Sequence, residues 1–231
     1  MARVSIRGDN RLLDTSSPMI ASLLLSVILT ASTLPVTNEK AWESLSSPEV
    51  PANKVVFTTD ELQIEVRRSA SVLLHFFETT QSVKKLRITG KVEGSLKGVS
   101  VEKAESPADS LLRVGLIEPG QRKMNPLQRI AAPQWLEDLE TRVLEHARGI
   151  ASIRCYHLLP DRRSIGPMRD HPMTSLLREK NHAAPDAEGN FELLIERDAP
   201  IPMIGLWLLA DGDDTDSEFV VTIQSIEVKN S

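Results

Sequence analysis

The densest group of residues that could do chemistry is an acidic cluster near the carboxyl end of this 231-residue chain. The cluster consists of Asp211, Asp213, Asp214, Asp216 and Glu218. Calcium takes six to eight oxygen ligands, mainly from carboxylates and carbonyls, and such a cluster is a candidate calcium site. An EF-hand loop is excluded, because the sixth position counted from Asp211 is Asp216 rather than glycine and the twelfth is Thr222 rather than glutamate.

The alternative for the acidic cluster is a solvated hairpin turn, in which Asp and Gly supply the backbone angles. The sequence favours this turn and no bound metal or other cofactor. If calcium binds, its best candidate ligands are Asp211, Asp213, Asp216 and Glu218.

Histidines form the second group of candidate chemical residues. His171 and His182, with Asp170 and Asp186, lie in a proline-rich stretch and offer zinc-binding side chains, but their spacing matches no tight ligand pair. We therefore interpret them as part of a surface loop. His75 and His157 fall in strand-like runs, and either would need a paired carboxylate or serine to act as a general base.

No catalytic motif is found in the sequence. There is no Gly-x-Ser-x-Gly elbow, no Gly-x-Gly-x-x-Gly and no phosphate loop. The single cysteine, Cys155, lies in an apolar run and is interpreted as a buried small hydrophobic residue. The net charge of −5 argues against a nucleic-acid partner, whose phosphates favour a basic face, and against docking on anionic lipid.

Short runs of alternating apolar residues predict that most of the elements are strands. These runs cover residues 62–67, 69–78, 86–92, 112–116, 150–159, 191–195 and 219–223. Residues 203–210 are almost wholly apolar and predict a central strand covered on both faces. One amphipathic helix is predicted at 133–148, with Leu136, Leu139 and Val143 on its buried face. A second, short helix is predicted near 174–180. Many strands and one good helix predict an antiparallel β-sandwich of the jelly-roll kind.

The carboxyl-terminal third is similar to a known superfamily. Residues 205–215, with the sequence GLWLLADGDDT, and residues 219–223, FVVTI, resemble the closing hairpin of galactose-binding-like jelly-roll domains. That superfamily includes many carbohydrate-binding modules. The resemblance implies a β-sandwich and glycan binding, and it transfers no individual ligand residue.

The amino-terminal end carries one long apolar run, residues 19–34, which is preceded by Arg3, Arg7 and Arg11. Such a segment is typical of a secretory signal peptide. An uncleaved membrane anchor and a buried core helix are the alternatives. The predicted organisation is therefore a signal peptide or anchor at 1–34, a linker at 35–54 and a β-sandwich domain at 55–231.

The sequence thus predicts a non-enzymatic extracytoplasmic domain, periplasmic or secreted, that binds or assists another molecule. A glycan or an envelope protein is the expected partner. Membrane contact is expected only through residues 19–34, and only if they are retained. The alternatives are a hydrolase on a β-sandwich scaffold and a structural subunit of a cell-envelope complex.

Overall fold

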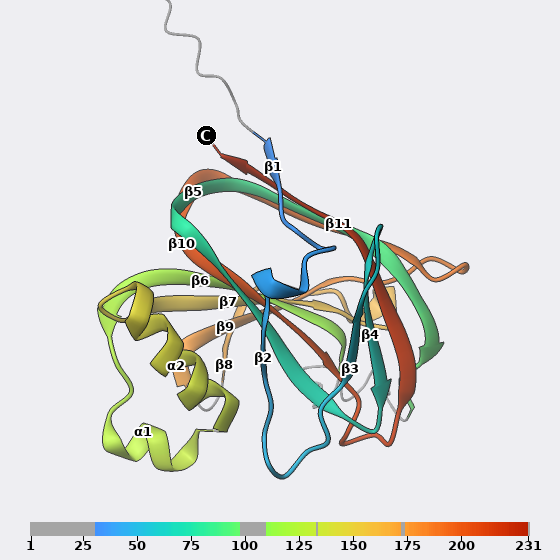
Figure 1. Ribbon diagram of the computed structural model, residues 1–231, viewed down its shortest axis with the longest axis horizontal. Helices are drawn as coiled ribbons and strands as arrows, with labels where there is room; N and C mark the ends of the chain where they lie inside the picture. Colours follow the sequence, from blue (N-terminus) through green and yellow to red (C-terminus); the bar gives the residue numbers. More distant parts are fainter. Residues whose placement is uncertain (1–30, 98–109, 133, 172–173, 231) are drawn as a thin grey trace, which may run out of the picture.

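The computed structural model describes residues 31–97, 110–132, 134–171 and 174–230 and confirms the mainly β architecture (Figure 1). The described strands are β1 (Ala31–Thr33), β2 (Glu43–Leu45), β3 (Lys54–Phe57), β4 (Leu62–Arg67), β5 (Ala70–Ser95), β6 (Ser110–Arg122), β7 (Ile150–Leu158), β8 (Arg169–His171), β9 (Thr174–Ala183), β10 (Asn190–Asp211) and β11 (Glu218–Asn230). The helices are α1 (Pro126–Ala131) and α2 (Gln134–His146), with 3-10 turns at Glu39–Ala41 and Arg162–Ser164.

A single hydrogen-bonded sheet forms both layers of the sandwich. Its strand order is β3-β4-β11-β5-β10-β6-β7-β9-β8, with β1 added to β11 and β2 added to β5. The two longest strands, β5 and β10, run through both layers, and their pairing shifts register between Glu196 and Ile201, where the sheet bends. All of these pairs are antiparallel except β7 with β9, which are parallel.

The main core lies between the two layers, and a second core lies outside one of them, under α2. Successive residues of a strand point to opposite faces, so β10 sends Leu206 and Leu208 into the main core and Trp207 and Leu209 toward the helix. The prediction that residues 203–210 are apolar because both faces are covered is confirmed.

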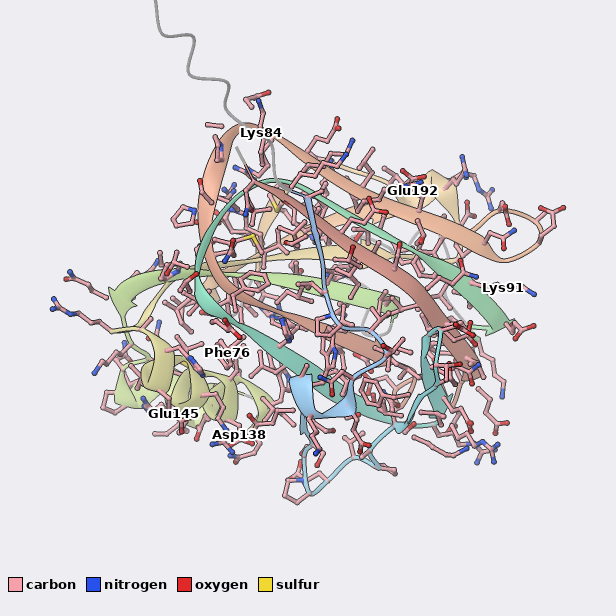
Figure 2. All side chains as sticks on the ribbon, turned by 45° about the horizontal axis from the view of Figure 1, so that its top comes forward. Phe76, Lys84, Lys91, Asp138, Glu145 and Glu192 are labelled. Atoms are coloured by element: carbon pink, nitrogen blue, oxygen red, sulfur yellow. The ribbon has the colours of Figure 1, made fainter. Side chains whose placement is uncertain are left out.

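Helix α2 is amphipathic, as its sequence predicts. Leu136, Leu139 and Val143 are buried against the sheet, whereas Asp138 and Glu145 point away from it (Figure 2). At the carboxyl end of the helix, His146 stacks on Phe76 of β5 with ring centroids 4.0 Å apart. The helix is thereby fixed on the outer face of the β5–β10–β6–β7 layer.

One local prediction is wrong, and one short helix was not predicted. The short helix predicted near 174–180 is wrong: this segment is strand β9, because it pairs with β7 on one side and β8 on the other. Helix α1 was not predicted. It begins at Pro126 with a capping box formed by Asn125 and Gln128.

The amino-terminal leader lies mostly outside the described residues, which begin at Ala31. Residues 31–33 form β1 on the edge of β11, and Leu34 is buried in the main core. Trp42 and Leu45, in the predicted linker, are buried as well. Within the described ranges, none of the helices has the length and apolarity needed to cross a bilayer.

Candidate ligand pocket at the Arg113–Asp211 ion pair

A pocket of about 580 Å³ opens at the end of the sheet where β10 finishes, a volume in the range of small-ligand sites. We call it the Arg113 pocket. It is lined by Leu45 and residues 47–50 after β2, residues 70–72 of β5, Arg113 of β6, Ala132, Gln134 and Trp135 around the start of α2, and Leu209, Asp211, Asp213 and Asp214 of β10 and its turn. Segments far apart in the sequence therefore build one concave surface.

An ion pair between Arg113 and Asp211 forms part of the lining. Arg113 Nη2 lies 3.1 Å from Asp211 Oδ2, and the two side chains are 15% and 11% exposed. Arg113 Nε also donates a hydrogen bond of 2.9 Å to Ser110 Oγ. A register shift between Leu209 and Asp211 accompanies this arrangement at the end of β10. A charged pair so well shielded from water offers fixed donors and acceptors to a ligand.

Trp135 supplies the aromatic part of the pocket wall. It is half-buried at the start of α2, and its ring centroid lies 5.5 Å from that of the buried Trp207. Trp207 in turn lies directly over Gly115 of β6, where a Cβ atom would come within 2.0 Å of the indole Nε1. Gly115 is therefore required for the close approach of Trp207 to the sheet, and Trp207 supports Trp135.

Hydrogen bonds of Asn53 fix the chain segment that follows residues 47–50 of the pocket lining. Its side-chain Nδ2 donates to the carbonyl of Ala210 at 2.8 Å, and its Oδ1 accepts from Ser69 Oγ at 2.7 Å. Its backbone N–H donates to Ser71 Oγ at 3.1 Å. Asn53 is buried and fully engaged, so it ties the segment after residues 47–50 to the ends of β5 and β10.

The acidic cluster is divided by the structure. Asp211, Asp213 and Asp214 line the Arg113 pocket, whereas Asp216 and Glu218 lie 3.9 and 3.7 Å from Arg68 Nε. Asp216 adopts a left-handed φ of 51°, as expected in a tight turn. In the described part of the chain, no three His, Cys, Asp or Glu side chains are grouped to hold a metal ion. For the cluster, a solvated turn stays the prediction and calcium binding stays its alternative.

His157 lies beside a carboxylate and is not one of the described residues that line the pocket. Its Nε2 is 3.7 Å from Glu179 Oε1, and His171 Nε2 is 4.0 Å from the same atom. Burial, and then the nearby charges of Arg113, Arg169 and His171, hold the pKa of His157 well below its ordinary value. Because His157 is only 1% exposed, it does not have the access to substrate that a general base requires.

The remaining candidate histidines are separated from one another. His182 Nε2 contacts the carbonyl of Leu194 at 2.6 Å, and its ring meets Tyr156 edge-on. Asp170 pairs with Arg178, and Asp186 holds a turn by accepting from the N–H groups of Glu188 and Asn190. The possible zinc ligands His182, Asp170 and Asp186 therefore contact other groups of the protein.

A second, more open pocket of about 970 Å³ lies near β1, and we call it the aromatic pocket. His75 stands there between Trp42 and Phe77, at ring-centroid distances of 5.1 and 5.7 Å. His75 Nδ1 contacts the carbonyl of Ala41 at 2.7 Å, and burial lowers the pKa of this histidine. The neutral ring must donate from Nδ1, because a carbonyl only accepts.

Sequence reasoning did not identify Glu49, Arg113, Gln134 or Trp135 as members of a site. Trp135 lies within the predicted helix at 133–148 and Arg113 within the predicted strand at 112–116, and neither pattern indicates a ligand site. A signal was present in Asp211, a charged residue that directly follows a fully apolar strand. It carried no information about its partner 98 positions earlier.

Comparisons with known proteins do not identify a ligand. No family model matches the chain, and no curated protein matches it. Among solved structures, it is similar to a xylan-binding module CBM15, at 9% identity and a TM-score of 0.38, over 88% of this chain and 97% of that one.

Two further solved structures are similar at the same level. One is the lumenal domain of VIP36 in a Ca²⁺- and mannose-bound form, at 7% identity and a TM-score of 0.37, over 86% of this chain and 88% of that one. The other is the enzymatically active domain of tailspike protein 4 of bacteriophage CBA120, at 5% identity and a TM-score of 0.37, over 84% of this chain and 20% of that one. Similarities of this size assign neither a family nor a ligand.

Proposed function

We propose that this chain is a non-enzymatic glycan-binding domain that works outside the cytoplasm. The observation that carries the proposal is the composition of the Arg113 pocket, in which the half-buried Trp135 lies with the amide of Gln134 and the Arg113–Asp211 pair. A sugar ring has an apolar C–H face and an edge of hydroxyl groups. An aromatic wall matches the first, and fixed charged or amide groups match the second.

Titration of the purified protein with a panel of soluble oligosaccharides tests the proposal. Trp135→Ala should weaken binding by about tenfold or more, because an aromatic contact contributes up to about 1.5 kcal/mol beyond the area it buries. Gln134→Ala should also weaken binding, and its exposed side chain can be removed without opening the core. Phe77→Ala is the matched control, because it removes an aromatic ring from the aromatic pocket instead.

The results distinguish the two pockets. Loss of binding with Phe77→Ala but not with Trp135→Ala would move the site to the aromatic pocket. Binding of no oligosaccharide would remove the proposal. Thermal unfolding of each variant separates a lost contact from a lost fold.

The extracytoplasmic location is proposed from the apolar run at 19–34 and its basic flank. Because Ala31–Thr33 pair with β11 and Leu34 is buried, a cleavage site is expected before Ala31. Fractionation of cells that express the full chain, with the intact mass of the product, tests both points. A full-length product in the cytosolic fraction would contradict them.

A hydrolase on the same scaffold is a second candidate, because four carboxylates line the pocket: Glu49, Asp211, Asp213 and Asp214. Paired carboxylates are the usual machinery of glycoside cleavage. Release of reducing ends from an oligosaccharide that the pocket binds, abolished by Asp213→Asn or Asp214→Asn, would favour this candidate. An intact oligosaccharide after long incubation favours simple binding.

A further inference from the structure

Residues 160–171, which we call the β8 segment, lie at one edge of the sheet. They contain the 3-10 turn Arg162–Ser164 and β8, which is the last strand in the sheet order and pairs with β9 (Figure 1). Every residue of the segment is exposed or half-exposed, although Met168 packs against the main core. Because the segment buries so little apolar surface, its local opening requires far less free energy than unfolding of the sheet.

The β8 segment is held on β9 mainly by polar contacts. The N–H of Gly166 donates to the backbone carbonyl of Asn181 at 3.0 Å, and Asn181 Nδ2 donates to the carbonyl of Ser164 at 3.0 Å. Asp170 and Arg178 form an ion pair at 3.0 Å. Their side chains are 76% and 40% exposed, so this pair contributes little to the attachment.

A further attachment is a buried cluster in which one carboxylate faces three basic side chains. Glu179 of β9 lies 3.7 Å from Arg169 and 4.0 Å from His171 of the β8 segment, and 3.7 Å from His157 of β7. Glu179 is 6% exposed and His157 is 1% exposed. Among the described residues, neither ring nitrogen of His157 has a hydrogen-bond partner, and Glu179 Oε2 has none either. The cluster is therefore buried and incompletely paired.

The charge balance of this cluster depends on protons. With both imidazoles neutral, the charge of Arg169 balances that of Glu179. A proton on His157 would add a second cation beside the same carboxylate, and burial makes such an excess of charge unfavourable. The charged or titratable groups around His157 are Glu179, Arg169, His171, Cys155 and Arg113 with its partner Asp211, and Asn181 is its neutral register partner.

We propose that the β8 segment is a pH-dependent strap, which lies on β9 at neutral pH and detaches as the pH falls toward about 5 and His157 takes up a proton. On detachment, Arg169 and His171 move away from Glu179, and water reaches the carboxylate and the protonated imidazole. Strands β7 and β9 stay in the sheet, because their apolar side chains remain in the two cores. The detached state leaves the outer edge of β9 unpaired. The strap does not depend on the glycan-binding function.

The direction of the response follows from the burial of His157. Burial holds the pKa of His157 well below its ordinary value while the strap is attached, and water restores it on detachment. The detached state therefore binds a proton that the attached state does not. Its population should rise about tenfold for each pH unit below about 6.5.

Hydrogen–deuterium exchange of the full chain, followed by mass spectrometry at about pH 7, 6 and 5, tests the proposal. After correction for the intrinsic pH dependence of amide exchange, protection of residues 161–171 should fall about tenfold between pH 6 and pH 5, whereas peptides from β10 and β11 should keep theirs. Unchanged protection of residues 161–171 would overturn the proposal. An equal loss in β10 and β11 would overturn it as well, because the whole sheet would then be unfolding.

Three variants locate the effect. His157→Gln should remove the pH dependence of this local exchange. His182→Gln is the matched control, because it removes another partly buried histidine of β9 outside the cluster, and it should leave the dependence intact. Glu179→Gln should raise exchange of residues 161–171 already at pH 7, because Arg169 loses its carboxylate.

The variants can also contradict the proposal. A pH dependence that survives in folded His157→Gln would exclude this histidine as the sensor. Exchange at pH 7 that is unchanged by Glu179→Gln would show that the carboxylate does not hold the segment. If His157→Gln does not fold, the wild-type protein and Glu179→Gln still decide between the two outcomes.

Discussion

Two polar groups lie side by side on the outer face of the same sheet, and they differ in how their charges are satisfied. In the Arg113 pocket, Arg113 and Asp211 lie 3.1 Å apart at the edge of a cavity. On the neighbouring strand, His157 is the direct register partner of Arg113 and lies 3.7 Å from Glu179. Neither of its ring nitrogens has a hydrogen-bond partner among the described residues. The first group lines a pocket, and the second is buried in the fold.

The difference shows what burial does to a charged group. A close pair at a pocket retains its charges and can present them. A histidine packed among Arg113, Arg169 and His171, with one carboxylate at a distance, is held neutral by loss of solvation. The same face of the sheet therefore carries one close ion pair at a pocket and one histidine that makes stability depend on pH.

The largest expected effect comes from breaking the close pair. Asp211→Ala should lower the free energy of unfolding by about 3 kcal/mol, because it leaves the guanidinium of Arg113 shielded from water without its carboxylate. The double variant Arg113→Met with Asp211→Leu should recover most of that loss. Urea unfolding of the wild type and of these two variants measures the loss and its recovery. A loss well below about 1 kcal/mol would mean that the pair behaves as a surface salt bridge.

The next largest effect is expected at Gly115, which lets Trp207 pack on the sheet beside Trp135. Gly115→Ala should cost about 2–3 kcal/mol, because the new methyl group would lie 2.0 Å from the Trp207 indole and force it off the sheet. Trp135 should move with it, so the affinity for oligosaccharide should fall too. Gly166→Ala is the control, since its Cβ would meet nothing within 4 Å. Unchanged stability would show that Trp207 has room to move.

The fold was largely predictable from the sequence, and the pocket was not. Alternation predicts strands wherever one face is buried, and it succeeded for residues 62–67 and 219–223. The continuous apolar run at 203–210 also predicted its strand, which is covered on both faces. Alternation failed at β9, because a run of polar residues such as Arg178, Glu179 and Lys180 becomes a strand only through pairing with its neighbours.

The pocket depends on distances in space that no local pattern encodes. Asp211 and Asp213 could be identified as an acidic turn, but Arg113 and Trp135 meet them only after β6 pairs with β10 and α2 packs on the sheet. Likewise, the sequence gives no sign that His157 and His171 converge on one carboxylate. A group of charged residues within one turn could therefore be identified from the sequence. A site assembled from several strands could not.

The second polar group predicts a pH dependence of stability. His157 is held neutral in the folded protein, so its folded pKa lies below the unfolded value of about 6.5. The contribution of the neutral His157 to the free energy of unfolding is fully present above that unfolded pKa. As the pH falls below it, the unfolded chain binds a proton that the folded chain does not, and the free energy of unfolding falls by up to about 1.4 kcal/mol per pH unit.

Urea unfolding between about pH 7 and pH 5 measures this dependence, and His157→Gln should flatten it. Burial also lowers the pKa values of His75 and His182, so these contribute in the same direction and part of the slope should remain in the variant. A slope that is identical in wild type and His157→Gln would contradict the assignment.

The smallest expected effect links the two groups. Burial is the main reason that the pKa of His157 is low, and the positive charge of Arg113 is the next. The Arg113→Met, Asp211→Leu variant removes that charge together with the carboxylate that partly offsets it. The His157 pKa, followed by NMR of its ring C–H signals, should therefore rise slightly and stay below its ordinary value. Arg169→Gln leaves the pocket intact and should act in the same direction. An unchanged pKa in both variants would mean that the charges of Arg113 and Arg169 do not reach His157, and that the two groups are neighbours without being coupled.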